Sequence, residues 1–446
     1  MSEILLQYER VNPTTWAYLA SLLVIALYFK FNRIWSVRNL DLVGLILLAP
    51  ALLMVKYGLD HLGASDDAAT NERARLVEHI GHVWLFVVSG LFLLRLLLDA
   101  AMVRRPLLEP NLSAGGLTFL GISLFAFLMA NVVTGDPDPA DLAGSRHAGQ
   151  LGSRTASESA ASSLSTHGPG FPLVFLLPHI PTQSLLGDEA QGTADEGTQS
   201  SPVPLVDEIT ARVMAILSQA AIVIGMVFVG FRHFDNVKTG IAAATLYLLL
   251  PYTAMWTGSV THALPGALLV WAIVMYRRPL AAGAMIGLAF GTIYYPVFLL
   301  PLWISFYWER GVVKFLIGML AMVGLLVGVL ALTSSDMAVF LAGLRQMFGW
   351  RFPVSSDMAG VWGEFWWPVY RYPVIAAHVG LALSFALWPA HKNLGILISY
   401  TAATMLCTQF WHAHSGGLAL AWYLPLLLLT IFRPNLEDRV ALAVVK

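Results

Sequence analysis

The chain has little charge and almost no cysteine. Only 12% of its 446 residues are charged, whereas 57% are hydrophobic. So little polar surface cannot cover a water-soluble protein of this size, which excludes an ordinary soluble enzyme. The single cysteine, Cys407, excludes an intrachain disulfide framework and a thiolate metal cluster. The net charge of -1 leaves no basic face for phosphates, so we expect no nucleic-acid partner.

The alternation of polar and apolar residues that an outer-membrane barrel needs is also missing. Instead, apolar runs of helix-spanning length recur along the chain, and helices satisfy every backbone polar group in lipid. The runs are roughly 14–29, 40–55, 79–101, 115–134, 207–231, 238–255, 262–276, 280–307, 314–333, 373–390, 394–411 and 417–432. The sequence therefore predicts an all-α, polytopic transmembrane helical bundle of about 12–13 spans, surrounded by membrane lipid.

Lysine and arginine gather in alternate turns between these runs. Cytoplasmic turns of membrane proteins accumulate these residues. Placing the N-terminus outside and the C-terminus in the cytoplasm puts every basic turn inside. The basic residues of these turns are Lys30, Arg33, Arg38, Arg104, Arg105, Arg232, Lys238, Arg277, Arg278, Arg310, Lys314, Lys392, Arg433 and Arg439.

This orientation requires the run 280–307 to cross the membrane twice, because basic turns stand both before and after it. The break at Tyr294-Tyr295-Pro296 favours two short helices that meet near the outer face, since proline ends or kinks a helix just before itself. One long tilted helix is the alternative. It would invert everything downstream.

Three regions follow from this pattern: a four-span N-terminal region over 1–134, a long extracytoplasmic loop over 135–206, and a multi-span region over 207–446. The loop is rich in Gly, Ser, Ala, Thr and acidic residues, which bury too little apolar surface to offset the entropy of ordering. We therefore expect most of it to be mobile, with an apolar island over 171–178 that docks on the membrane surface.

Two carboxylates on the predicted outer side are candidates for catalysis. Asp60 lies just outside the membrane boundary, and Glu364 stands among aromatic residues that would raise its pKa. Either could act as a general base that deprotonates an acceptor hydroxyl. An ordinary solvated turn explains Asp60 equally well.

The outer loops also carry candidate ligand-binding residues. Trp256, His262 and Tyr295 combine rings and polar groups of the kind that bind sugars, although tryptophan and tyrosine also anchor membrane interfaces. Arg351 and Arg371 are embedded among aromatic residues and could bind a phosphate through two hydrogen bonds.

A histidine-bearing loop follows the penultimate run. Its His412 and His414 could bind phosphate when protonated, or a divalent metal. No cofactor or metal site is otherwise expected.

Polar residues inside the third run support other interpretations. His79 and His82 are three residues apart on one helical face, a spacing that haem or a metal could use. Arg95 and Asp99 are four apart and predict an intrahelical ion pair, or alternatively a proton or ion relay.

The C-terminal region, roughly 207–432, resembles the polytopic glycosyltransferases of the GT-C type, especially bacterial alpha-mannosyltransferase-like families that use polyprenyl-phosphate sugars. The resemblance lies in a small-residue helix, a Tyr-Tyr-Pro break and a Leu-rich helix over 287–301. It extends to the segments 261–266 and 421–426.

The resemblance implies a GT-C-like fold in a bacterial inner (plasma) membrane and transfer of a sugar from a polyprenyl-phosphate donor to an acceptor outside the cytoplasm. No glycine-rich nucleotide-binding loop is present, as a lipid-borne donor would allow. The alternatives are a non-enzymatic carrier or accessory subunit with a polar intramembrane pathway, and a haem-bearing membrane protein.

Overall fold

The computed structural model describes residues 12–62, 67–102, 109–152, 170–186, 205–347, 358, 360–413 and 416–435. Within these ranges the chain is helical and contains no strand. Each of the twelve predicted apolar runs contains helical residues. The helices of the N-terminal region are α2 (Pro13–Tyr28), η1 (Phe31–Arg33), α3 (Val37–His61), α4 (Ala68–Leu97), η2 (Leu98–Ala101) and α5 (Ala114–Thr134).

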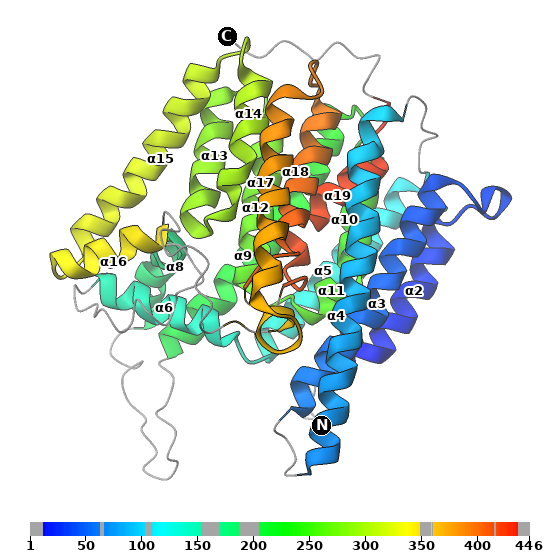
Figure 1. Ribbon diagram of the computed structural model, residues 1–446, viewed down its shortest axis with the longest axis horizontal. Helices are drawn as coiled ribbons and strands as arrows, with labels where there is room; N and C mark the ends of the chain where they lie inside the picture. Colours follow the sequence, from blue (N-terminus) through cyan, green and yellow to red (C-terminus); the bar gives the residue numbers. More distant parts are fainter. Residues whose placement is uncertain are drawn as a thin grey trace.

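The structure describes two helices within the predicted loop 135–206, α6 and α8, and the helices from α9 onward form the C-terminal region (Figure 1). They are α6 (Pro139–Gly152), α8 (Gly170–Leu186), α9 (Leu205–His233), α10 (Val237–Leu249), α11 (Pro251–Met255), α12 (Val260–Val274), α13 (Pro279–Thr292), η4 (Tyr295–Leu299), α14 (Leu300–Tyr307), α15 (Val312–Thr333), α16 (Met337–Met347), η5 (Val361–Phe365), η6 (Pro368–Tyr370), α17 (Arg371–Leu387), α18 (Leu394–Thr408), η7 (Leu420–Trp422) and α19 (Leu424–Phe432).

Six of the described helices are long and apolar enough to cross a membrane, and six further apolar segments are 10–17 residues long. The outward face of α15 exposes large apolar side chains, among them Val313, Leu320 and Leu332. Together with the length and hydropathy of the helix, apolar residues that face outward along it favour contact with lipid. These features indicate an integral membrane protein with a helical bundle.

Polar caps mark where several of these helices begin. Ser36 accepts a hydrogen bond from the backbone N–H of Asn39, and Ser113 accepts one from Gly116. Asn393 does the same for Ile396 at the start of α18. Each cap satisfies a backbone donor that the first helical turn leaves without a partner.

The run 280–307 reverses direction instead of forming one long helix. Ile293 is extended, and Pro296 stands at the second position of η4, directly after Tyr295, so α13 cannot continue through the break. A Cβ built on Gly311, after α14, would lie 3.3 Å from Cγ of Pro279, which begins α13. Both ends of the segment are therefore on the same side of the bundle, as the two-helix interpretation requires.

The basic turns gather at one end of the bundle, which we call the basic end. There Lys30 donates a hydrogen bond to Asn111, and Arg310 donates one to the carbonyl of Lys392. The opposite end, the aromatic end, holds α6, α16 and the start of α17 (Figure 1). The two sets of loops that the sequence separated by charge are thus separated in space.

The two ends are joined by one continuous hydrophobic core. A single buried cluster contains residues of α2, α3 and α5 together with residues of α10, α18 and α19. Tyr28 of α2 donates a hydrogen bond to the carbonyl of Ala242, and its ring meets Phe432 edge-on. The four-helix N-terminal region therefore shares its core with the C-terminal region.

A buried ion network ties the same regions at the basic end. Arg95 lies 2.8 Å from Asp99, which confirms the predicted intrahelical pair, and 3.0 Å from Asp41 of α3. Arg433, just after α19, lies 2.7 Å from the second oxygen of Asp99. Two carboxylates and two guanidinium groups offset one another, which lowers the cost of burying each charge.

The described parts of the region 135–206, residues 135–152 and 170–186, are mainly helical, and the rest of the predicted mobile loop lies outside the described residues. Helix α6 lies across the aromatic end instead of along the bundle, and α8 packs against it (Figure 1). Phe171 and Phe175, in the apolar island, are almost fully buried in the core. Their burial supplies the apolar contact that composition alone did not reveal.

Candidate functional site

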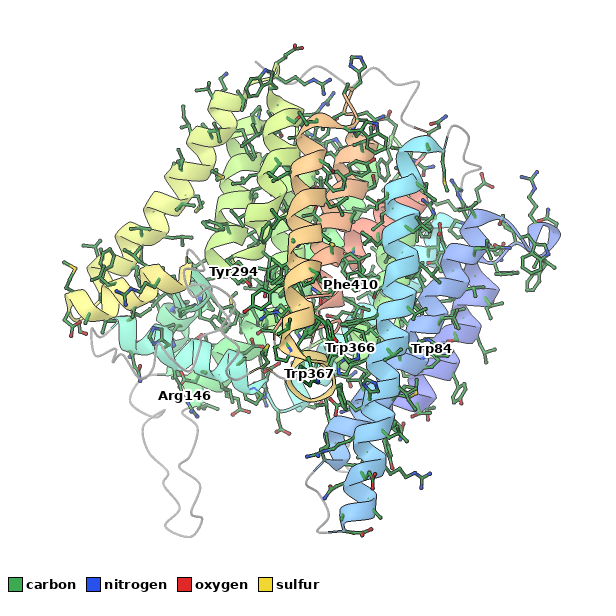
Figure 2. The ribbon with its side chains drawn as sticks, in the orientation of Figure 1. Trp84, Arg146, Tyr294, Trp366, Trp367 and Phe410 are labelled. Atoms are coloured by element: carbon green, nitrogen blue, oxygen red, sulfur yellow. The ribbon has the colours of Figure 1, made fainter. Side chains whose placement is uncertain are left out.

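The aromatic end contains a cluster of rings around the break between α13 and α14. Tyr295 is 3% exposed, and its ring centroid lies 5.2 Å from Trp411, 5.1 Å from His412 and 5.4 Å from Trp422. The ring of Tyr294 (Figure 2) is tilted against that of Tyr295, with 4.1 Å between ring centroids. Helix α13 ends at Thr292, before the two tyrosines, and Pro296 follows them directly, so both stand at the break between the helices.

Arg371, the first residue of α17, is buried beside this cluster. It is only 4% exposed. Its Nε donates a 2.6 Å hydrogen bond to the carbonyl of Trp411, its guanidinium carbon lies 5.8 Å from the centre of the Trp411 ring, and its Nη1 lies 3.7 Å from Sδ of Met358. Trp411 is itself fixed, because its Nε1 donates a 2.6 Å hydrogen bond to Nδ1 of His378.

The structure gives Arg371 no acidic partner among the residues that it describes. Among the described residues, no carboxylate lies within ion-pair distance of it, and its Nη2 makes no hydrogen bond to them. A buried cation without a counter-charge is costly, by several kcal/mol in typical cases. An anion that entered this place would recover part of that cost through charge-assisted hydrogen bonds.

A second group of rings adjoins the first through Trp422. The indole Nε1 of Trp422 donates to the carbonyl of Thr261, at the start of α12. The next residue, His262, stacks on Trp256 with 4.9 Å between centroids, and its Nδ1 lies 2.7 Å from the hydroxyl of Tyr252. The structure therefore brings Trp256, His262, Tyr295, His412 and Arg371 into one continuous site.

Two aspartates of the α6 region border this site, and sequence reasoning missed both. Asp141 is fully buried and caps α12, because its Oδ2 accepts from the backbone N–H of Val260 at 2.8 Å and its Oδ1 accepts from the Thr261 hydroxyl at 3.3 Å. Burial raises the pKa of Asp141 well above its usual range, and the charge of Asp138 adds to the rise.

Asp138 is half-buried and interacts electrostatically with His262. It also begins α6, since its Oδ1 accepts from the backbone N–H of Ala140 at 2.9 Å. The pair Asp138-Pro139, a cap residue followed by proline at the first helical position, is a helix-start signal that would have pointed to α6. The glycine- and serine-rich composition of 135–206 hid it.

The other predicted site residues do not all reach the cluster. Asp60 lies in the last turn of α3, with its side chain 51% exposed and 2.9 Å from Lys56, near the tip of the α3–α4 hairpin that projects beyond the bundle (Figure 1). Glu364 has its backbone in η5, next to Trp362, whose Nε1 donates to the carbonyl of Phe410. The side chain of Glu364, all of Arg351 and His414 lie outside the described residues.

The histidines considered for haem have other contacts. His82 is buried with its Nε2 3.6 Å from Glu78, and the ring of His79 lies 4.5 Å from that of Phe365. Over the described part of the chain, no group of three His, Cys, Asp or Glu residues could hold a metal ion. Cys407 is buried in α18.

No known family model matches this chain, and neither a curated protein nor a solved structure is similar to it. The basis for assigning a function is therefore the chemistry of the aromatic end. There a buried guanidinium, without an acidic partner in the described part of the chain, is flanked by aromatic rings and bordered by carboxylates.

Proposed function

We propose that this protein is an integral membrane glycosyltransferase that transfers a sugar from a polyprenyl-phosphate donor to an acceptor on the outer side of a bacterial inner membrane. The observation that carries the proposal is Arg371, buried at 4% exposure without a carboxylate among the described residues. Its guanidinium suits the phosphate of a lipid-linked sugar, because planar bidentate donors match phosphate oxygens.

The rings beside Arg371 support a sugar as the group attached to that phosphate. The rings of Trp422 and Tyr295 lie side by side. Trp256 stacks on His262, which directly follows Thr261, the residue whose carbonyl accepts a hydrogen bond from Trp422. Aromatic faces pack against the C–H faces of sugars, while imidazole and hydroxyl groups bond to sugar oxygens. We assign sugar or lipid contact to Trp256, His262, Tyr295 and His412.

In the proposed reaction an acceptor hydroxyl oxygen bonds to the anomeric carbon, and the bond from that carbon to the phosphate oxygen breaks. The polyprenyl phosphate leaves with the bonding electrons and is stabilised by Arg371, while a carboxylate accepts the hydroxyl proton. We prefer Glu364 and Asp138 as bases. The backbone of Glu364 adjoins the site in η5, and the side chain of Asp138 interacts electrostatically with His262 of the site. Asp60, paired with Lys56 at an exposed tip, is the weaker choice.

The test is binding of undecaprenyl phosphate by the purified protein in lipid nanodiscs. We expect Arg371→Gln to weaken binding at least tenfold, because a hydrogen bond to a charged group contributes about 1.5–3 kcal/mol. Arg345→Gln is the matched control, since Arg345 is an exposed arginine of α16 at the same end. Wild-type affinity in Arg371→Gln would refute the phosphate role.

Turnover of a panel of polyprenyl-phosphate hexoses then distinguishes the bases. Glu364→Gln or Asp138→Asn should abolish transfer while undecaprenyl phosphate still binds, and Asp60→Asn should leave transfer close to wild type. Loss of transfer in Asp60→Asn alone would restore Asp60 as the base.

The alternative function, a non-enzymatic carrier or accessory subunit, is favoured by one observation. Glu78 and His82 form a pair buried in α4, at 3% and 1% exposure, where an ionisable pair could serve a polar pathway. Arg95 and Asp99 do not add to it, because both are held in ion pairs. A protein that binds no polyprenyl phosphate and transfers no sugar, yet loses transport in Glu78→Gln, would support this alternative.

A further inference from the structure

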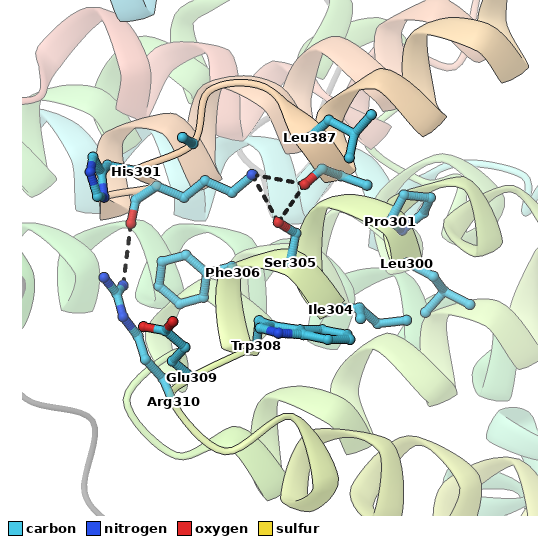
Figure 3. Close-up of a pocket in the computed structure, with 13 residues that line it drawn as sticks. Leu300, Pro301, Ile304, Ser305, Phe306, Trp308, Glu309, Arg310, Leu387 and His391 are labelled. Carbon is cyan, nitrogen blue, oxygen red and sulfur yellow. Dashed lines mark hydrogen bonds between the residues drawn. The ribbon is translucent and has the colours of Figure 1, made fainter.

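A cavity of about 630 Å³ opens at the basic end, between α14 and the α17–α18 turn (Figure 3). Its walls combine apolar residues of both helices with Arg310 and Lys392. Helix α17 has 17 residues and begins at Arg371, so the cavity is separated from the aromatic-end site by about 25 Å of helix. It is a different site.

Lys392 brings a buried positive charge to this cavity. It is 6% exposed, and its Nζ donates to Oγ of Ser305 at 2.9 Å (Figure 3). It also donates to the carbonyls of Pro389 at 2.9 Å and Ala386 at 3.3 Å. All three acceptors are neutral, and no described carboxylate lies within ion-pair distance. Neutral oxygens hold the ammonium in place without cancelling its charge, and burial lowers the pKa of Lys392.

Arg310 adds a second cation at the mouth of the cavity. Its Nη1 donates to the carbonyl of Lys392 at 3.2 Å, and its guanidinium lies 5.2 Å from the centre of the Phe306 ring. These contacts orient the group and leave most of its donors available. Glu309 brings one negative charge to the lining, so the two cations give the cavity a net positive charge even when His391 is neutral.

The rest of the lining is suited to hydrocarbon. Leu387 is 82% exposed and Trp308 is 70% exposed, and Leu300 and Ile304 continue the apolar surface along α14. A tryptophan exposed at the end of a membrane helix marks the level of the lipid headgroups. The cavity therefore presents positive charge at headgroup level above an apolar wall.

We propose that this cavity binds an anionic phospholipid from the leaflet at the basic end. Arg310 donates hydrogen bonds to the phosphate, Lys392 adds attraction at short range, and an acyl chain lies along Leu387 and Ile304. Basic residues between helices on the cytoplasmic side attract anionic headgroups in this way. The proposal does not depend on the glycosyltransferase function, because it uses neither Arg371 nor the rings around Tyr295.

The test is native mass spectrometry of delipidated protein titrated with phosphatidylglycerol or with phosphatidylcholine of the same acyl chains. We expect phosphatidylglycerol to bind about tenfold more tightly, and Arg310→Gln to remove that preference. Lys314→Gln is the matched control, because Lys314 is an exposed basic residue close by in sequence that does not line the cavity. Equal binding of the two lipids, or an unchanged preference in Arg310→Gln, would overturn the proposal.

Crosslinking tests where the phospholipid binds and whether the bound phosphate belongs to a lipid or is free phosphate. A photoreactive amino acid at Leu387 should form an adduct with phosphatidylglycerol, and inorganic phosphate at equal concentration should not reduce it. Competition by inorganic phosphate would show a site for free phosphate instead. Absence of the adduct would place the bound lipid elsewhere, which contradicts the proposal even if Arg310→Gln were poorly folded.

Discussion

Buried charges in this protein differ in the partners that hold them. Arg433 meets the carboxylate of Asp99, so its charge is cancelled inside the fold. Arg371 and Lys392 instead meet neutral oxygens and a ring. A cancelled charge has a structural explanation, whereas an oriented and uncancelled one is suited to an anion. This distinction at the scale of single residues is the basis of the two proposed binding sites, one at Arg371 and one at Lys392 with Arg310.

Asp141 gives a prediction about pH at the same scale. Its pKa is raised by burial, so the folded protein keeps a proton that the unfolded chain has released above about pH 4. The free energy of unfolding therefore falls as pH rises from about 4 through the raised pKa, by up to about 1.4 kcal/mol per pH unit. Asp141→Asn, which keeps an oxygen for the Val260 N–H, should flatten this dependence in thermal unfolding in detergent.

The control for this measurement is Asp336→Asn. Asp336 is an exposed aspartate that accepts from the backbone N–H of Val339 and so caps α16 as Asp141 caps α12. Its replacement should leave the pH dependence unchanged. An equal pH dependence in wild type and Asp141→Asn would show that Asp141 is ionised in the folded protein.

Charge asymmetry was enough to predict that residues distant in sequence share one end of the bundle. Trp256, Tyr295 and His412 come from three different loops, yet they lie in one cluster. Which loop residues enter the site could not be predicted, because that depends on packing between helices. Asp141 was missed for this reason, since its contact with Val260 joins segments 119 residues apart.

At the scale of elements, close helix packing depends on glycine. A Cβ on Gly283 of α13 would collide with the carbonyl oxygen of Phe315 in α15, and a Cβ on Gly318 would collide with the carbonyl of Leu280. The two glycines thus let the helix backbones approach each other from both sides. Small residues serve this purpose in membrane helices, where apolar burial alone does not drive association.

Gly283→Ala should therefore destabilise the protein although alanine favours helix. The collision with backbone has no flexible side chain to relieve it, and overpacking of this kind costs about 1–3 kcal/mol. Gly328→Ala on α15 is the matched control, because nothing lies within 4 Å of a Cβ at that position. We expect it to be neutral or slightly stabilising. Equal thermal stability of the two variants in detergent would contradict this account of the α13–α15 contact.

The sequence was enough to predict a helix boundary where a proline interrupts an apolar run. Tyr294-Tyr295-Pro296 predicted the reversal between α13 and α14, because the effect of proline on a helix is local. The start of α6 has such a local signal in Asp138-Pro139, but the packing of α6 against α8 was not predictable in the same way. Phe171 and Gly144 pack closely only once the chain has folded, so a composition window over 135–206 contains no trace of the contact.

At the scale of the whole molecule, one core and one ion network join regions that the sequence divides. The core runs from α2 to α19, and Asp99 connects Arg95 of α4 with Arg433 after α19. The bundle therefore has two chemically distinct ends on a single body. The proposed transfer site lies at one end of the bundle and the proposed phospholipid site at the other. The orientation of the bundle in the membrane therefore decides which compartment each site faces.

Thiol labelling at the two ends of α17 tests the orientation of the bundle in the membrane. Cys407 is buried and can be replaced by alanine, after which single cysteines are placed at Tyr370 and Trp388, which are 64% and 59% exposed. Because basic turns face the cytoplasm, an impermeant maleimide on intact spheroplasts should label position 370 and should label position 388 only after permeabilisation. A cysteine at Trp35, 85% exposed in the first basic turn, should behave like position 388. The reverse pattern would put Arg371 and its rings on the cytoplasmic side, where an acceptor outside the cell could not reach them.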